Sequence, residues 1–426
     1  MNKRVLVVGT TPDYVDLVRR RYPGRALFLT ERSLRLKARE DTPDPSEEVL
    51  ADFDDTKGVM SALDTHLARN NVTLSGVACY DDESLSLASA LAKRGGLPFA
   101  EEKAIRISRS KFHSKRAWIG AEVPCPRVQI ARDEEALEAV VDRLGLPIVL
   151  KPLTGSGSEL VFWCRKREDA RKAFRTIRRK LAHHPDKRMY PADFMPGGNF
   201  DPRQDVVAEE SFAGPEYSCD FLLFGQRAQL VRLAGKIISP HLGTGTAFMY
   251  YIPDRVETGI ARRDLENQLA LAAASLGFET GIFMADFISH RGKACFLEVS
   301  PRPAGDCLPW LVQASGGVDT LGLALDMAEG KRADLPDLDT FQPLAAVRLF
   351  AREPGVLKNV DTSELPSDPR VVEVTLYRRP GHRIVLPPGD YGSRILGHII
   401  FRPESRYTLH EEGVELESLV EIHMES

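Results

Sequence analysis

One stretch decides the fold, Gly281 to Asp306, with the sequence G-I-F-M-A-D-F-I-S-H-R-G-K-A-C-F-L-E-V-S-P-R-P-A-G-D. Its apolar residues predict two strands joined by a polar turn at Ser289–Lys293. Each predicted strand carries one acid, Asp286 on the first and Glu298 on the second. Because successive side chains of a strand alternate between its two faces, each acid shares a face with particular neighbours. The face of Asp286 carries Ile282, Met284 and Ile288, and the face of Glu298 carries Phe296 and Ser300.

A hairpin centred on Gly292 places Asp286 and Glu298 directly opposite each other, with their Cβ atoms about 5 Å apart. Two carboxylates so close in an apolar setting repel each other unless they share a proton or a cation. Oxygen ligands suit magnesium, which normally keeps its other positions for water and substrate phosphates. A half-exposed hairpin with two solvated acids accounts for this stretch equally well.

The whole chain has the composition of a soluble globular protein, with 43% hydrophobic and 28% charged residues. A chain of 426 residues is too long to fold around one ordinary hydrophobic core, so about two or three domains are expected. The net charge of −4 excludes a general nucleic-acid binder. The six cysteines are scattered without a C-x-x-C pair, which is typical of reduced thiols in a cytosolic protein. Neither a signal peptide nor a membrane-spanning run is found, so a cytoplasmic protein without membrane association is expected.

The N-terminal part predicts a doubly wound parallel sheet. A strand at Arg4–Val8 is followed by a helix at Tyr14–Tyr22 and a second strand at Ala26–Thr30. No G-x-G-x-x-G follows the first strand, so nicotinamide dinucleotide binding is not indicated. A further strand, Leu74–Tyr80, is followed by the acids of Asp81–Glu83. These acids lie where ligands bind in open α/β sheets, although acids at a helix N-terminus look the same.

Two regions carry lysines suited to binding phosphate. In the basic helix predicted at Glu101–Gly120, Lys111 and Lys115 are four residues apart and share a face, although a solvated basic face would look the same. Lys151 ends a predicted strand and precedes a loop of small residues, namely Gly155, Ser156, Gly157 and Ser158. A Walker-type loop needs its lysine after the glycines and a helix next, so this is a different arrangement. Small residues nevertheless allow close approach of backbone N–H groups to phosphate oxygens, and a flexible flap can exclude water.

Further polar residues lie between these lysines and the acidic hairpin. A strand from Val206 runs into Glu209, Glu210, Ser211 and Phe212, turns at Gly214-Pro215, and is followed by a strand beginning at Glu216. The next strand, Leu230–Ile237, contains Lys236 and precedes a loop of small residues at His241–Thr246. From Leu344 onward, short strands indicate a mostly β region, some of whose strands extend the main fold, without a catalytic constellation of its own.

The order of these features resembles the ATP-grasp superfamily. The resemblance covers about residues 1–330 and rests on the lysine helix, the strand-lysine-Gly/Ser loop, E-E-S-F-A-G-P-E, the strand lysine and the two-acid hairpin ending in E-V-S-P-R. It implies an α/β and α+β fold in which ATP lies between two lobes. The implied parts are a doubly wound N-terminal domain (1–100), a basic helix and small lobe (101–210), a large lobe with the metal acids (211–330) and a β-rich C-terminal domain (331–426).

The resemblance also implies a role for each site residue. Lys111 and Lys151 would contact the α- and β-phosphates, and the Gly155–Ser158 loop would fold over the triphosphate. Glu209, Glu210 and the backbone of Ser211 and Phe212 would bind the adenine, and Glu216 would bind the ribose hydroxyls. Lys236 would lie near the transferred phosphate, and Arg302 would stabilise the acyl phosphate. Asp286, Glu298 and Ser300 would bind two magnesium ions, with manganese as a substitute. Ser300 departs from the family, which usually has asparagine there, so the second metal position is the weaker one.

The implied activity is ATP-dependent ligation of a carboxylate to an amine through an acyl phosphate, which releases ADP and phosphate. The P-R-P-A-G-D segment and the β-rich C-terminal domain are most similar to those of the L-amino-acid ligases. This similarity makes Arg302 and the Pro303–Asp306 turn candidates for gripping an amino-acid carboxylate. A bicarbonate-using carboxylase or carbamoyl-phosphate-type enzyme and a non-catalytic ATP-binding module are the alternatives. The partners implied are a small carboxylate and a small amine, and the apolar content is compatible with a homodimer.

Overall fold

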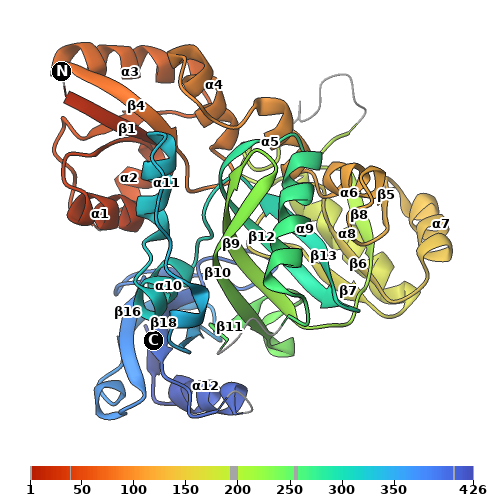
Figure 1. Ribbon diagram of the computed structural model, residues 1–426. Helices are drawn as coiled ribbons and strands as arrows, with labels where there is room; N and C mark the ends of the chain where they lie inside the picture. Colours follow the sequence, from red (N-terminus) through yellow and green to blue (C-terminus); the bar gives the residue numbers. More distant parts are fainter. Residues whose placement is uncertain (1, 39, 192–199, 254–257, 406–407, 426) are drawn as a thin grey trace.

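Four parallel strands form the N-terminal sheet, in the order β3-β2-β1-β4. They are seen in a computed structural model, which describes residues 2–38, 40–191, 200–253, 258–405 and 408–425. Figure 1 shows α3 and α4 on one side of this sheet and α1 on the other. The predicted parallel β-α-β arrangement is therefore confirmed. The elements are β1 (Asn2–Val8), α1 (Pro12–Arg21), β2 (Ala26–Glu31), α2 (Arg32–Lys37), β3 (Glu48–Ala51), α3 (Thr56–Asn70), β4 (Val72–Ala78) and α4 (Leu85–Gly95).

The basic segment that follows forms two helices, α5 (Glu102–Arg109) and α6 (Lys111–Gly120), and not the single helix predicted over Glu101–Gly120. The break lies at Ser110, whose backbone is extended and whose hydroxyl accepts a hydrogen bond from the His113 N–H at 3.2 Å. A serine in this position caps a helix N-terminus by satisfying one of its free N–H groups. As a consequence Lys111 is the first residue of α6, and its own N–H donates to the Leu153 carbonyl at 2.9 Å.

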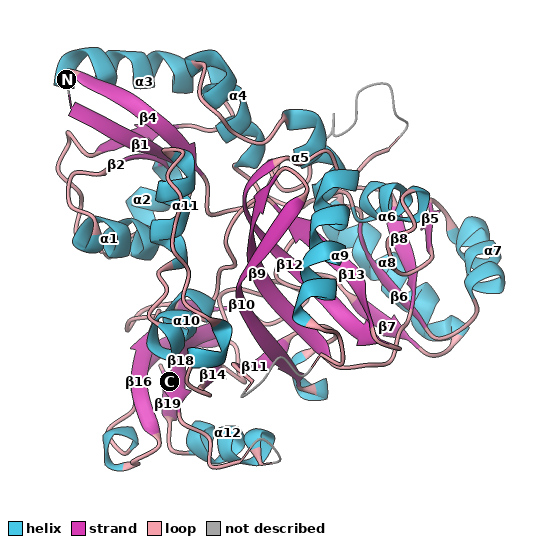
Figure 2. Cartoon of the chain, viewed as in Figure 1, coloured by secondary structure: helices cyan, strands magenta, loops and turns pink. Residues whose placement is uncertain are grey.

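A second, antiparallel sheet has the order β5-β8-β6-β7. Two helices pack against it through their apolar faces, Leu137, Val140 and Val141 of α7 and Ala173, Phe174 and Ile177 of α8. Figure 2 shows this lobe at the right-hand end of the molecule. Its elements are β5 (Val128–Ala131), α7 (Glu134–Leu144), β6 (Ile148–Pro152), β7 (Phe162–Cys164), α8 (Arg167–Leu181) and β8 (Val206–Glu210).

The largest sheet has eight antiparallel strands in the order β13-β12-β9-β10-β11-β14-β18-β16. Helix α9 packs on the face that carries Phe221, Phe283 and Phe287, while α10 and α11 pack on the opposite face against Leu222 and Ile282. Helix α11 also contacts β4 of the N-terminal sheet, so one core joins the two parts. The elements are β9 (Glu216–Phe224), β10 (Arg227–Ile238), η1 (Pro240–Leu242), β11 (Ala247–Tyr251), α9 (Arg262–Ser275), β12 (Thr280–His290), β13 (Lys293–Ser300), α10 (Leu308–Gly316) and α11 (Thr320–Ala328).

The C-terminal strands extend this sheet, as the sequence predicted, because β14, β18 and β16 continue it beyond β11. Three other strands form a separate small sheet in the order β17-β15-β19. Helix α12 was not anticipated, because its buried apolar residues are only Leu409 and Leu416, a weak periodic signal. The elements are η2 (Leu338–Thr340), β14 (Ala345–Phe350), β15 (Gly355–Asp361), η3 (Leu365–Ser367), β16 (Val371–Leu376), β17 (Arg383–Ile384), β18 (Ile395–Phe401), α12 (Leu409–Ser418) and β19 (Glu421–Met424).

The decisive hairpin forms as predicted, with Asp286 directly opposite Glu298. The turn is tighter than expected, because Arg291 and Gly292 alone connect the strands, both with positive φ (49° and 72°). A bulge then shifts the pairing, so that Phe287 lies opposite Phe296 and Leu297 is the extra residue. The prediction that Phe296 shares the face of Glu298 is therefore wrong. Phe296 is buried in the core beneath α9, whereas Leu297 and Glu298 both line the cavity described below.

Candidate functional site

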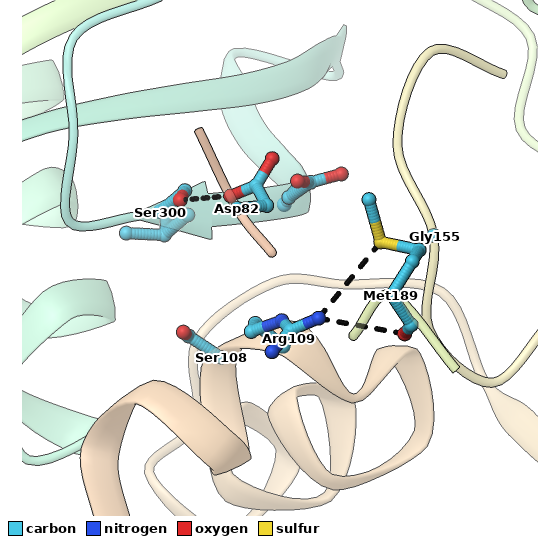
Figure 3. A pocket seen from close by; sticks show the side chains of 8 residues that line it. Asp82, Ser108, Arg109, Gly155, Met189 and Ser300 are labelled. Atoms are coloured by element: carbon cyan, nitrogen blue, oxygen red, sulfur yellow. Dashed lines mark hydrogen bonds between the residues drawn. The ribbon is translucent and has the colours of Figure 1, made fainter. Parts of the chain in front are cut away.

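A cavity of about 950 Å³ lies between the small antiparallel sheet and the eight-stranded sheet. Its size is at the upper end of that of small-molecule sites. Fifteen of the predicted site residues line it, and Ser300 lies in a small adjoining cavity together with Asp82 and Glu298 (Figure 3). The fifteen are Lys111, Lys151, Gly155, Ser156, Gly157, Ser158, Glu209, Glu210, Ser211, Phe212, Glu216, Lys236, Asp286, Glu298 and Arg302.

Buried lysines converge at one wall of the cavity. The ammonium of Lys111 donates to the Gly155 carbonyl at 2.5 Å, and that of Lys151 lies 2.5 Å from Glu209 Oε2. Lys115, on the same face of α6, lies 3.1 Å from Glu209 Oε1 and also donates to the Leu297 carbonyl. The predicted shared face is confirmed, and it is not solvated, since Lys115 has no exposed surface.

Burial lowers the pKa of Lys115 to about 8, against the opposing effect of Glu209, and it also lowers the pKa of Lys111. Burial by itself would raise the pKa of Glu209, but Lys115 and Lys151 reverse this and lower it below its usual value. The carboxylate of Glu209 is thus held by two lysines, and the nearby Glu298 partly offsets the charge of Lys111.

The small-residue loop lies against a second loop across the cavity. Ser158, which has a φ of 60°, donates its hydroxyl to the Gly245 carbonyl at 2.8 Å. The backbone N–H of Trp163 donates to the hydroxyl of Thr244 at 3.1 Å. Gly155 has a φ of 117°, a conformation that residues with a side chain rarely adopt, so glycine is favoured there. These contacts close one side of the cavity between the two loops.

The segment after β8 forms the adjacent wall. The carboxylate of Glu210 turns away to Arg127, whose Nε lies 3.0 Å from it. The indole N–H of Trp163 donates to the Ser211 hydroxyl at 3.1 Å, and the ring of Phe212 packs edge-on against His290. The Glu210 side chain is thus engaged by Arg127, and the segment 209–214 lines the cavity.

Lys236, on β10, links two acids of two other strands, β9 and β12. Its ammonium lies 2.8 Å from Glu216 and 2.6 Å from Asp286. Burial opposes its charge, but Asp286 and Glu216 outweigh burial and raise the pKa of Lys236 above its usual value. Burial raises the pKa of Glu298. The charges of Asp82 and Asp286 raise it further, whereas Lys111 lowers it.

Asp82, which follows β4 of the N-terminal sheet, is the main site residue that the site prediction missed. It accepts a hydrogen bond from the Ser300 hydroxyl at 2.7 Å (Figure 3). It also accepts one from Arg302. Burial raises the pKa of Asp82, but Arg302 and Ser300 outweigh burial and bring it to about 2. The sequence did place acids at Asp81–Glu83, at the carboxyl end of β4, where ligands bind in open α/β sheets. The structure brings this end of the N-terminal sheet against the end of β13.

The residues present fit a hard divalent cation. Asp286 Oδ1 is buried without a hydrogen-bond partner among the described residues, and burial raises the pKa of the neighbouring Glu298. Within the described part of the chain, no group of three or more His, Cys, Asp or Glu side chains is arranged to hold a metal unaided. Two carboxylates suit magnesium when substrate phosphates supply further oxygens. The Ser300 hydroxyl proton is already given to Asp82, so a metal would find only the serine lone pairs there.

No helix in the described residues is long and apolar enough to cross a membrane.

Residues 144–309 match the family model described as ATP-grasp domain. The whole chain superimposes on an L-amino acid ligase from Bacillus licheniformis with a TM-score of 0.75 and 17% identity, covering 100% of this chain and 99% of the other. It also superimposes on the biotin carboxylase domain of the Hydrogenobacter thermophilus 2-oxoglutarate carboxylase, solved with MgADP and bicarbonate (TM-score 0.68, 16% identity, 99% and 90% coverage). At these identities the superpositions establish the fold.

Two relatives found by sequence have a higher identity to this chain than the two solved structures above. The protein y4rH of Sinorhizobium fredii is 28% identical over 336 residues, which are 78% of this chain and 65% of that protein. Human carnosine synthase 1 is 27% identical over 281 residues, 62% of this chain and 32% of the synthase. The matches therefore span less than two thirds of one relative and about a third of the other.

Proposed function

Since this chain has the ATP-grasp fold and carries an ATP-grasp domain over residues 144–309, we propose that it is an ATP-dependent carboxylate–amine ligase. It forms an amide through an acyl phosphate, releases ADP and phosphate, and acts on amino-acid-like substrates. One observation carries the proposal. A single cavity joins the phosphate-binding lysines, the acids Asp286 and Glu298, and Arg302.

ATP lies along this cavity with its adenine against the backbone of residues 210–212 and its ribose at Glu216. The ammonium groups of Lys111 and Lys151 and the backbone of the Gly155–Ser158 loop hold the phosphates. Asp286 and Glu298 would hold Mg²⁺, which would neutralise charge on the phosphate oxygens. Lys236, which contacts Asp286 and Glu216, is placed beside this position to meet the transferred phosphate.

The reaction needs no protein nucleophile. A carboxylate oxygen of the first substrate attacks the γ-phosphorus, the bond from that phosphorus to the ADP oxygen breaks, and an acyl phosphate forms. The amine of the second substrate then attacks the acyl carbon, phosphate leaves, and the amine gives up a proton to form the amide. Arg302 and Lys236 stabilise the negative charge on the oxygens of both transition states. The contact of Ser158 with Gly245 keeps water from the acyl phosphate.

The test is phosphate release from Mg-ATP by the full chain, screened over pairs of amino acids and related carboxylates. Release is expected only when a carboxylate and an amine are both present. Asp286→Ala and Glu298→Ala variants are expected to lose turnover, and full turnover in either would refute the proposal.

Two other results would assign a different function. ADP formation that depends on bicarbonate indicates the carboxylase or carbamoyl-phosphate alternative. ATP binding in a calorimeter without phosphate release from any substrate pool indicates a non-catalytic module.

A further inference from the structure

Tyr391, in the C-terminal β-rich region, packs against the small lobe. It lies in the segment between β17 and β18, and its half-buried ring contacts the hydrophobic core formed by α7, α8 and the small antiparallel sheet. Burial raises the pKa of Tyr391, whereas a hydrogen bond from the backbone of Leu160 opposes this. Leu160 lies two residues after Ser158, at the end of the small-residue loop. The C-terminal region therefore touches the loop that is expected to cover the phosphates.

Hydrogen bonds within its own segment give Tyr391 a fixed position. The carboxylate of Asp390 accepts from the N–H groups of Gly392 and Ser393 at 2.8 and 3.1 Å. The Ser393 hydroxyl accepts from the N–H of Val385 and donates to its carbonyl, both at 3.0 Å. These bonds close the base of the segment. The ring of Tyr391 is therefore presented by a preformed loop, which loses little conformational entropy when it packs on the small lobe.

The loop that Tyr391 touches holds two residues other than glycine in the left-handed backbone region. The φ angles are 60° at Ser158 and 55° at Leu160. Residues with a side chain adopt this region only at a free-energy cost, and they keep it where surrounding contacts enforce it. Each of the two has such a contact, Ser158 with the Gly245 carbonyl at 2.8 Å and Leu160 with Tyr391. The loop is therefore held in a conformation that it would leave if these contacts were lost.

The loop that faces Ser158 is anchored on the same C-terminal strands. Arg394, which immediately precedes β18, donates through Nη2 to the Leu242 carbonyl at 2.8 Å. Arg348, on β14, donates through Nη1 to the Ala247 carbonyl at 2.7 Å. Both contacts that hold the small-residue loop therefore lead back to the C-terminal region.

We propose that Tyr391 is a positioning residue for the ligase reaction, because it holds the 155–160 loop closed over the triphosphate. It touches no reacting atom and acts through the backbone of Leu160. While the loop is held, water is kept from the acyl phosphate until the amine reacts. This inference rests on the proposed ligase function and goes beyond it, since it gives the C-terminal region a part in catalysis.

The first measurement is hydrogen exchange of the 155–160 backbone amides in the full chain without nucleotide. Tyr391→Ala is expected to speed this exchange about 5- to 10-fold, the value of one hydrogen bond together with its packing. Tyr391→Phe keeps the ring and is expected to have a smaller effect. Val385→Ala is the control and should leave the exchange unchanged. Val385 lies in the same segment, is 37% exposed and is not among the described residues that pack on the small-lobe core.

The second measurement separates a positioning role from a merely structural one. It follows ADP release from Mg-ATP with the carboxylate that best supports turnover, in the presence and in the absence of amine. Tyr391→Ala is expected to raise the amine-independent release and the rate at which a non-hydrolysable ATP analogue dissociates, each about 5-fold. A general loss of folded protein would lower both kinds of ADP release together, so it cannot produce this result.

Unchanged exchange of the 155–160 amides in Tyr391→Ala, or an equal change in Val385→Ala, would overturn the inference. Faster exchange without any rise in amine-independent ADP release would also overturn it, because the loop would then not govern the access of water. Either result leaves the ligase function standing when the wild type still joins a carboxylate to an amine. A wild type that binds no ATP analogue would overturn both.

Discussion

Replacing Asp82 by asparagine tests whether the N-terminal sheet completes the site. Asp82 accepts from both Ser300 and Arg302, and it is 6% exposed. Its pKa of about 2 in the folded chain compares with an ordinary value of 3.8. At 1.36 kcal/mol per pKa unit, this difference corresponds to about 2 kcal/mol of stability from the ionised carboxylate. Asp82→Asn is expected to lose at least this much at neutral pH, because Arg302 is also left buried without its counter-charge.

The sign of the pH dependence follows from the lowered pKa. The contribution of Asp82 is complete above about pH 4, the unfolded value, and is lost as the pH falls towards 2. The gap in unfolding free energy between wild type and Asp82→Asn therefore narrows over this range. Urea unfolding at several pH values measures it, with the exposed Asp64, paired with Arg94, as the control site. Asp64→Asn is expected to change stability very little.

The turnover number of Asp82→Asn gives a second test of the role of this carboxylate. Asp82→Asn is expected to lower kcat because Arg302 loses its orientation, while ATP still binds through the lysines and the 210–212 segment. An Asp82→Asn protein with wild-type stability and wild-type kcat would refute the role assigned to this carboxylate.

Three further predictions concern the rest of the cavity. Glu209→Gln leaves the buried Lys115 and Lys151 without a counter-charge, and is expected to lower the free energy of unfolding in urea by about 3–5 kcal/mol. Glu210→Gln is the control and should lower it far less, because Glu210 pairs with Arg127 at the surface. Ser158→Ala loses the bond to the facing loop, worth about 1 kcal/mol, and should increase ADP release in the absence of amine, while Ser156→Ala should not. Because burial raises the pKa of Glu298, calorimetry should find Mg-ATP affinity rising with pH as this carboxyl ionises, and Glu298→Gln should abolish that rise.

The sequence by itself determined the features that depend on neighbours in the chain. Alternating apolar residues and one Gly turn were enough to predict the hairpin and to place Asp286 opposite Glu298. The order of the lysines, the small-residue loop and the acids predicted fifteen of the residues that line one cavity, because the resemblance rests on that order. The role of each residue in the nucleotide site stays a prediction.

Only the tertiary structure decided how distant segments complete the site. The capping hydroxyl of Ser110 breaks the basic helix, and the bulge at Leu297 turns Phe296 into the core, although neither break interrupts a hydrophobic pattern. Asp82 reaches Arg302 across 220 residues, and Arg348 reaches Asp306 from a strand that joins the sheet later. Such pairings depend on which sheets pack together, and a charged residue in a sequence carries no signal of the partner that neutralises it.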